Sequence, residues 1–177
     1  MNDPFWVFAY GSLMWAPGFE ATETRLATAY GYHRAMCLRS HNYRGTREKP
    51  GLVLGLDRGG SCHGVALRVA PGRAAAVRAY LHEREMRGGV YAERSLKIVL
   101  DDGRRVQAIA YIVRRDHLQY CGGMEPAEMA ALIRTGVGAR GSARDYLANT
   151  VAHIEALSLA DSSLRRLLDL VDGEGKV

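Results

Sequence analysis

An apolar run rich in aromatic and β-branched residues opens the chain over residues 5–10 and stops at Tyr10-Gly11-Ser12. Such a run predicts a buried strand. A glycine directly after a core strand lets the backbone turn and lets another group approach the main chain closely. Successive N–H groups in such a turn can form a concave site for an anion. An ordinary strand-ending turn has the same pattern, so the spacing leaves both interpretations open.

Period-two alternation, short apolar runs and turn residues dominate the chain as far as residue 113, and Pro71-Gly72 introduces one helical stretch. A loop is expected over residues 11–22 and another over 41–51. The remaining predictions follow from the same pattern. They are a long or bent strand 25–39 with Gly31 as a candidate bulge, strands 52–56 and 63–69 joined by a hairpin at Asp57-Arg58-Gly59-Gly60, an amphipathic helix 73–86 stopped by Gly88-Gly89, and strands 92–100 and 104–113 around Asp101-Asp102-Gly103.

From Glu125 onward the pattern becomes helical. Pro126 suits a first helical position, while Ser142 and Asp161 suit N-caps. Helices are therefore predicted over 126–135, 143–158 and 162–171, and the tail 172–177 is expected to fray. Strands joined mostly by hairpins, followed by helices, indicate an α+β fold with a curled antiparallel or mixed sheet. No repeat or linker interrupts the chain, so a single domain 1–177 is expected.

Composition narrows the function classes. The 177 residues are 47% hydrophobic and 24% charged, as in a soluble globular protein. The net charge of +5 favours anionic ligands in general, but the basic residues are scattered, which argues against nucleic acid. Three widely spaced cysteines, Cys37, Cys62 and Cys121, fit a reducing compartment. The N-terminal apolar run is too short for a signal peptide or membrane span, so a cytoplasmic protein is expected.

Glu85 is the most interesting acid. Measured around the predicted helix from Val77, Leu81 lies at about 40° and Glu85 at about 80°, which places Glu85 at the edge of the apolar stripe. The C-terminal end of a helix and partial burial both raise the pKa of a carboxyl group, as suits a general base. A surface ion pair with Arg84 or Arg87 is the alternative, and Arg84 lies nearer the centre of the stripe.

Other motifs lack the context that their chemistry requires. Gly136-x-Gly138-x-x-Gly141 follows a predicted helix rather than a strand, so we interpret it as an interhelical loop instead of a dinucleotide site. The six histidines are far apart and form no metal-binding motif. Ser12 is outside a nucleophile elbow, and Cys62 and His63 point to opposite faces of a strand. Tyr91 and Tyr146 have no signal beyond that of core aromatics.

Four blocks together resemble the ChaC branch of the γ-glutamylcyclotransferases, in the family's order and over nearly the whole chain. They are Val7-Phe8-Ala9-Tyr10-Gly11-Ser12-Leu13-Met14-Trp15, Arg44-Gly45-Thr46-x-x-Lys49-Pro50-Gly51, Tyr80-Leu81-x-x-Arg84-Glu85-Met86-x-x-Gly89-x-Tyr91, and Asp145-Tyr146-Leu147. The resemblance implies a small mixed β-barrel with flanking helices and cleavage of glutathione to 5-oxoproline and Cys-Gly. It implies no cofactor or metal.

By this resemblance Glu85 is the catalytic acid/base. The loop Ala9-Tyr10-Gly11-Ser12-Leu13-Met14 would hold the γ-glutamyl group, and Tyr91 and Tyr146 would line the same pocket. The chain departs from the family pattern at Ala9, where relatives often have glycine, and at Val90, an extra residue before Tyr91.

Two rival functions follow from the same features. One is a cyclotransferase for other γ-glutamyl amino acids or amines, and the other is a non-catalytic binding module of the same fold. Glu85 argues against the binding module, because a pure binder needs no acid beside its pocket. The residues that recognise Cys-Gly and the oligomeric state are left open.

Overall fold

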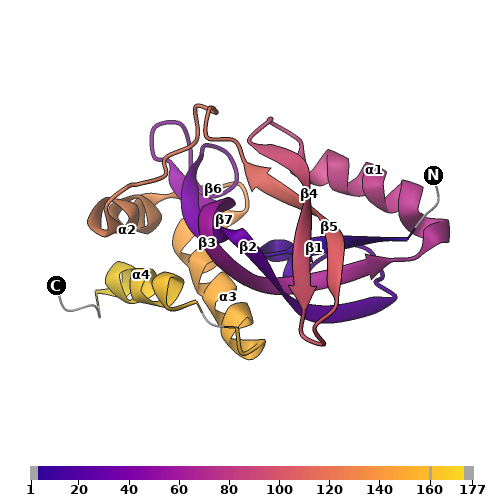
Figure 1. Cartoon of the computed structure of the whole chain (residues 1–177). Helices are drawn as coiled ribbons and strands as arrows, with labels where there is room; N and C mark the ends of the chain where they lie inside the picture. The colour runs from indigo at the N-terminus through magenta and orange to yellow at the C-terminus, as the bar shows by residue number, and fades with distance from the viewer. Residues whose placement is uncertain (1–3, 160, 174–177) are drawn as a thin grey trace. The chain divides into compact units, whose positions relative to one another are not determined.

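The computed structural model describes residues 4–159 and 161–173. It divides into two compact units, the first formed by Met1–Arg34 with Leu56–His117 and the second by Ala35–Gly55 with Leu118–Val177. Strands β2 and β3 contribute to both units, and each unit is described by itself (Figure 1). Whether the chain behaves as one domain, as the sequence predicts, stays a prediction.

A closed barrel of five strands forms the first unit. Its order is β1-β3-β2-β4-β5, where β1 is Phe5–Ala9, β2 Glu23–Ser40, β3 Gly51–Val69, β4 Tyr91–Leu100 and β5 Arg105–Val113. The pair β1–β3 is antiparallel, whereas β1–β5 is parallel, so the barrel is mixed. The ring closes where β5 pairs with β1. The predicted α+β class and the mixed barrel are therefore confirmed.

The hairpin predicted at residues 57–60 is wrong. Residues 51–69 form one continuous strand, β3, and Gly59 and Gly60 lie within it at φ of +105° and +68°. His33 of β2 donates a hydrogen bond from Nδ1 to the carbonyl of Gly59 at 3.0 Å, so this segment stays beside its neighbour strand. Two glycines with positive φ therefore bend a strand here rather than reverse the chain.

The hairpin β4–β5 has the predicted turn, with Gly103 at φ +87°, and its ladder runs from the pair Tyr91–Val113 to Val99–Arg105. Strand β2 is also one long strand, as predicted, with Gly31 at φ +82°. Both predictions relied on glycine at positions of positive φ, where other residues are strained.

Helix α1, Ala74–Glu85, packs on the barrel within the first unit and follows a short 3-10 turn, Pro71–Arg73. Its buried residues are Ala74, Val77 and Leu81, which are three or four positions apart, as the amphipathic pattern predicts. Gly88 and Gly89 follow at φ of +85° and +70° and end the helical stretch. This arrangement leaves Glu85 as the last helical residue.

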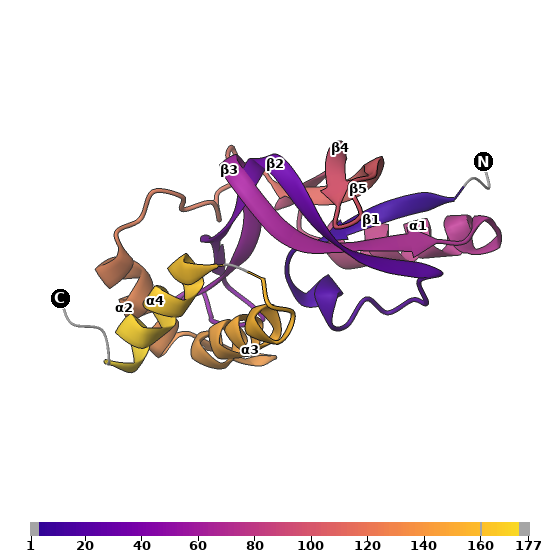
Figure 2. The same cartoon turned by 60° about the horizontal axis from the view of Figure 1, so that its bottom comes forward.

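Three helices dominate the second unit and lie together in both views (Figures 1 and 2). They are α2 Pro126–Thr135, α3 Ala143–Ala156 and α4 Ser162–Asp172. Both predicted caps are present, because Ser142 Oγ accepts from the Asp145 N–H at 3.0 Å and Asp161 Oδ1 from the Leu164 N–H at 3.4 Å. Of the tail predicted to fray, Asp172 is helical, and residues 174–177 lie outside the described residues.

The glycine-rich segment 136–141 connects α2 to α3 as a tiny hairpin of two strands, β6 Val137–Gly138 and β7 Gly141–Ser142. A helix precedes it, so the interpretation as an interhelical connection is correct. Close backbone approach explains the glycines, since a Cβ on Gly136 would lie 2.4 Å from the Cα of Gly51. Across the part of the chain that the structure describes, no helix is long and apolar enough to cross a membrane.

Candidate active site

The loop after β1 turns through a 3-10 helix, Ser12–Met14, directly behind the buried Gly11. The N–H of Met14 donates to the Gly11 carbonyl at 2.9 Å, and that of Ala16 donates to the Ser12 carbonyl at 2.8 Å. The first N–H groups of such a helix have no acceptor inside it. The amides of Ser12 and Leu13 therefore begin a helix and are suited to an external acceptor. Whether this turn binds an anion stays a prediction.

Contacts with three other strands hold the start of this loop. The Tyr10 hydroxyl donates to the carbonyl of Tyr111 on β5 at 2.9 Å. Arg34 of β2, only 5% exposed, donates from Nε to the Tyr10 carbonyl and from Nη2 to the His63 carbonyl at 2.7 Å. Ala9 is fully buried opposite Val65 of β3. The backbone at residues 9–11 is thus pinned before the turn begins.

Glu85 lies at the C-terminal end of α1, and its side chain is 16% exposed. Burial raises the pKa of this carboxyl group, while the neighbouring Arg84 opposes the rise through its charge and hydrogen bond. The Nε of Arg84 lies 3.1 Å from Oε1 of Glu85. The alternative interpretation, a surface ion pair between Glu85 and Arg84 or Arg87, is therefore right that Arg84 is a partner of Glu85 but wrong that Glu85 lies on the surface. The result is a largely buried acid whose proton affinity is raised, as general-base chemistry requires.

Arg84 also joins α1 to the loop after β1. Its Nη2 donates to Ser12 Oγ at 2.9 Å, and its Nη1 donates to the Ala16 carbonyl at 2.6 Å and to the Tyr80 hydroxyl at 2.8 Å. A planar guanidinium with five donors suits such multiple contacts. Arg84 thereby links the loop after β1 to the end of α1 that carries Glu85, although 72 residues separate Ser12 from Arg84.

Tyr111 completes the surroundings of the acid. Burial is the largest cause that raises the pKa of this phenol, followed by Glu93, and the charge of Glu85 adds to the effect. The Tyr111 hydroxyl donates to Glu93 Oε2 at 3.3 Å. Both carboxylates therefore lie within electrostatic reach of one neutral phenol, on the side of β4 and β5 that α1 covers.

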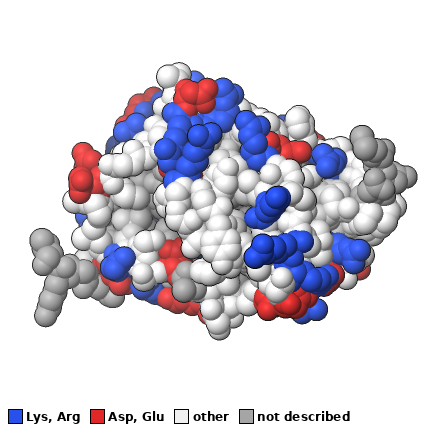
Figure 3. All heavy atoms as spheres, in the orientation of Figure 1, with Lys and Arg blue, Asp and Glu red and all other residues white. Residues whose placement is uncertain are grey.

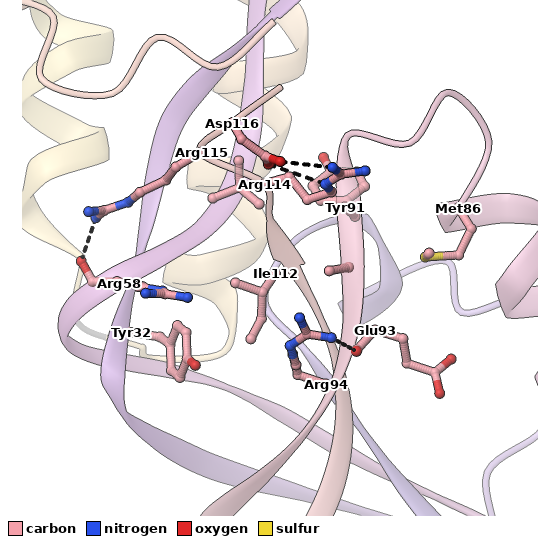
Figure 4. A pocket seen from close by; sticks show the side chains of 12 residues that line it. Tyr32, Arg58, Met86, Tyr91, Glu93, Arg94, Ile112, Arg114, Arg115 and Asp116 are labelled. Carbon is pink, nitrogen blue, oxygen red and sulfur yellow. Dashed lines mark hydrogen bonds and ion pairs between the residues drawn. The ribbon is translucent and has the colours of Figure 1, made fainter. Parts of the chain in front are cut away.

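Tyr91 is the first residue of β4, opposite Val113 of β5. It lines a hollow of about 730 Å³ together with Met86, the residue directly after Glu85. Figure 4 shows this hollow, with four arginines among the residues that line it. Figure 3 shows lysine and arginine side chains gathered in groups on one face, with acidic residues among them. Among the described residues, no group of three His, Cys, Asp or Glu side chains is arranged to hold a metal ion.

Several known proteins are similar to this chain over most of its length. The family model described as ChaC-like protein matches residues 5–174. The chain belongs to the ChaC-like family. A relative from Escherichia coli, named glutathione-specific gamma-glutamylcyclotransferase, is 38% identical over 165 residues, which cover 93% of this chain and 71% of the relative. One from Schizosaccharomyces pombe with the same name is 31% identical over 80% of this chain and 78% of its own length.

A solved structure gives the same fold. The crystal structure of a yeast gamma-glutamyl cyclotransferase specific to glutathione aligns with a TM-score of 0.87 at 22% identity and covers 98% of both chains. At this identity the likeness concerns the fold alone. The barrel and helices of this ChaC-like chain are thus those of a known architecture, as the sequence resemblance implied.

Tyr146 belongs to the second unit. Its hydroxyl accepts from the N–H of Leu54 at 3.3 Å, and the guanidinium of Arg44 lies over its ring at 5.2 Å from the centroid. Arg44 in turn donates to the carbonyls of Arg140 and Ser142. The late tyrosine of the ChaC-like pattern is therefore held by the second block of that pattern. Its place in one pocket with Glu85 stays a prediction.

Sequence reasoning missed two arginines, Arg34 and Arg84, which hold the loop of this ChaC-like site. The signal for Arg84 was present, because a charged residue near the centre of an apolar helical stripe has to satisfy its donors inside the protein. Arg34 lies on a strand where buried and exposed positions alternate irregularly, so nothing local marked it.

Proposed function

We propose that this protein cleaves the amide bond between the γ-glutamyl group and the cysteine of glutathione to give 5-oxoproline and Cys-Gly. The observation that carries the proposal is Glu85, a buried carboxyl with a raised pKa that Arg84 ties to the loop after β1. The names of the bacterial and fission yeast relatives support glutathione as the substrate.

The reaction is an intramolecular acyl transfer. The α-amino nitrogen of the γ-glutamyl group attacks its own γ-carbonyl carbon, a C–N bond closes the five-membered lactam, and the bond to the cysteine nitrogen breaks. The Glu85 carboxylate takes a proton from the attacking amine and passes it to the departing cysteine nitrogen, so the carboxylate is regenerated in each turnover. Folding the γ-glutamyl arm supplies much of the rate, because nucleophile and carbonyl belong to one molecule. These steps use no cofactor.

We assign the loop Ala9-Tyr10-Gly11-Ser12-Leu13-Met14 to the γ-glutamyl group. The amides of Ser12 and Leu13 would bind its α-carboxylate or the oxyanion that forms at the γ-carbonyl. Buried anchors at Tyr10 and the Arg84 contact to Ser12 hold this backbone in place before substrate arrives. We also assign Tyr91 and Tyr146 to the walls of the pocket.

The test uses purified protein and reduced glutathione, with 5-oxoproline and Cys-Gly followed by mass spectrometry. Products from the wild type and a loss of about 100-fold or more in Glu85→Gln would support the assignment, since general acid–base catalysis contributes about 10²–10⁴-fold. Near wild-type turnover in a folded Glu85→Gln protein would refute it.

A panel of γ-glutamyl amino acids and amines addresses the rival functions. Turnover of that panel without turnover of glutathione would replace the substrate assignment and keep the mechanism. Silence on every substrate would favour a binding module. A cytoplasmic location is part of the proposal and awaits its own test by cell fractionation.

A further inference from the structure

Two cysteines of the second unit lie on neighbouring segments of the backbone. Cys37 belongs to β2, and Cys121 lies between β5 and α2. None of the three cysteines of the chain forms a disulfide bond in this structure, and the proposed reaction uses none of them. The pair is therefore separate from the chemistry assigned to Glu85.

Backbone hydrogen bonds fix the register of the two segments. Leu38 and Tyr120 form an antiparallel bridge, and the N–H of Cys121 donates to the carbonyl of Cys37 at 2.8 Å. A matching bond of 2.8 Å on the other side of the bridge completes the antiparallel pattern. One residue along from such a bridge, the two chains again present directly opposite residues, whose side chains share a face. Cys37 and Cys121 are therefore cross-strand neighbours.

The spacing of such neighbours fits a disulfide bond. Opposite residues that share a backbone hydrogen bond have α-carbons about 5.5 Å apart, inside the range of about 4.4–6.8 Å that disulfides span. Their Cβ atoms need to approach by roughly 1 Å at most. The segment with Cys121 can make this movement, because an isolated bridge joins it to β2 and the exposed Gly122-Gly123 follows it.

The two thiols differ in exposure, which sets the order in which they react. Cys37 is 2% exposed, whereas Cys121 is partly exposed. Burial raises the pKa of the Cys121 thiol, and the charge of Arg39 opposes this rise. A small disulfide in solution therefore meets Cys121 first, at a rate that grows as more of this thiol is ionised. The buried Cys37 lies opposite and can displace the group that Cys121 has taken up.

We propose that Cys37 and Cys121 form a dithiol site that glutathione disulfide oxidises to an intramolecular disulfide. The Cys121 thiolate attacks one sulfur of glutathione disulfide, a mixed S–S bond forms, and one glutathione thiolate leaves. The Cys37 thiolate then attacks the Cys121 sulfur and releases the second glutathione thiolate. The two protons of the protein thiols end on the two glutathione thiolates, so one glutathione disulfide is reduced as one protein disulfide forms.

The choice of glutathione disulfide rests on the proposed function, because this compound is the oxidised form of the proposed substrate. The dithiol itself does not rest on that function, since its contacts lie within the second unit. Oxidation would replace an isolated bridge between β2 and the segment before α2 with a covalent link.

The test incubates reduced wild-type protein with excess glutathione disulfide at about pH 8.5, where much of an ordinary thiol is ionised. After an acid quench, N-ethylmaleimide in denaturant labels every remaining thiol. The expected product has lost two hydrogen atoms in intact mass and takes one label. Its tryptic digest contains a peptide that joins residues 35–39 to residues 116–134. The matched control is Cys62→Ala, which replaces the buried third cysteine and should form the same cross-link.

Single variants test the order of the two steps. Cys37→Ala should stop at the mixed disulfide between Cys121 and glutathione, because no second thiol lies opposite. Cys121→Ser changes a partly exposed side chain and should take up little glutathione, because the remaining Cys37 is buried. A folded Cys121→Ser protein that loses its thiols as fast as wild type would overturn the proposed order and with it the site.

The readout is mass rather than turnover, so failure of this site is distinct from failure of the proposed reaction. A wild type that keeps three labelled thiols, or that stops at the mixed disulfide, overturns the dithiol site. A cross-link to Cys62 or between two molecules overturns it as well. Hydroxyethyl disulfide, which has no γ-glutamyl group, serves as a second oxidant. Cross-linking by hydroxyethyl disulfide but not by glutathione disulfide would overturn glutathione disulfide as the ligand.

Discussion

Replacing Arg84 with methionine is expected to move the pH dependence of catalysis. Burial raises the pKa of Glu85, and the charge of Arg84, with Nε 3.1 Å from Oε1, is what opposes that rise. Methionine keeps an unbranched side chain of similar length in the half-buried site and removes the charge. Burial then acts unopposed, and the pKa of Glu85 rises further.

The structure sets the size of the effect. Two unit charges about 4 Å apart attract by about 1 kcal/mol in bulk water and by about 4 kcal/mol at the effective dielectric constant of a protein surface. The side chains of Arg84 and Glu85 are 25% and 16% exposed, which places the pair between these limits. Since about 1.36 kcal/mol corresponds to one pH unit, the titration is expected to move by about one to three pH units.

The assay is the pH profile of kcat/KM for glutathione over about pH 4 to pH 9. Glu85 accepts a proton only when it is ionised, so activity falls as the pH drops through its pKa, and a higher pKa moves this acid limb to higher pH. Tyr111, a phenol on which the charge of Glu85 acts, stays neutral over this range because its pKa is also raised. The substrate amine titrates identically in every variant.

Two further variants test whether the charge of Arg84, rather than its hydrogen bonds or an arginine charge nearby, moves the acid limb. Arg84→Lys keeps the charge and loses the fork of hydrogen bonds to Ser12 and Ala16, so its acid limb should stay near that of wild type while kcat falls. Arg87→Met, at an exposed position just beyond α1, should change neither. An Arg84→Met limb that coincides with wild type, or lies at lower pH, would refute the assignment of Glu85 as the titrating base.

Three stability predictions follow. Because the folded-state pKa of Glu85 is raised, the native state binds the proton of Glu85 more tightly than the unfolded state, so the contribution of Glu85 to stability is full at low pH and is lost as the pH rises through the folded pKa. The variant Glu85→Gln should therefore have a higher Tm than wild type at a pH above that pKa, and this difference should disappear in acid. An equal Tm difference at both ends of the pH range would contradict the prediction. Gly51→Ala should destabilise by about 1–3 kcal/mol or more in urea unfolding, because the new Cβ would lie 2.1 Å from the Arg44 carbonyl oxygen, while Gly72→Ala, which meets open space, should be nearly neutral. Arg34→Met should cost at least about 2 kcal/mol, since it strands the carbonyls of Tyr10 and His63, and a loss below 1 kcal/mol would show that water replaces the guanidinium.

Local signals were sufficient for most of the elements. The spacing of Val77 and Leu81 placed Glu85 at the edge of a buried stripe, and the structure has it there as a largely buried acid. The turn at Gly103 and the cap at Ser142 were equally readable, because each depends on a few neighbouring residues with one conformational preference. The prediction of a loop after β1 that suits an anion rests on local signals of the same kind.

Residues 57–60 show where such signals fail. Two adjacent glycines have the pattern of a hairpin, and nothing nearby in the sequence reveals that His33 of another strand holds them in a continuous β3. A glycine with positive φ can reverse a strand or bend it, and the choice depends on which strands lie beside it. The sequence pattern is the same in both cases.

By itself, then, the sequence determined the elements, the acid at the end of α1 and the backbone turn after β1, since these depend on propensities and periodicities within short windows. Only the tertiary structure decided how the acid and the turn are joined. The bonds of Arg84 to Ser12 and of Arg34 to Tyr10 connect residues that are 72 and 24 positions apart. The tertiary structure also decided the raised pKa of Glu85, because desolvation is a property of the packed protein around the carboxyl group and not of its neighbours along the chain.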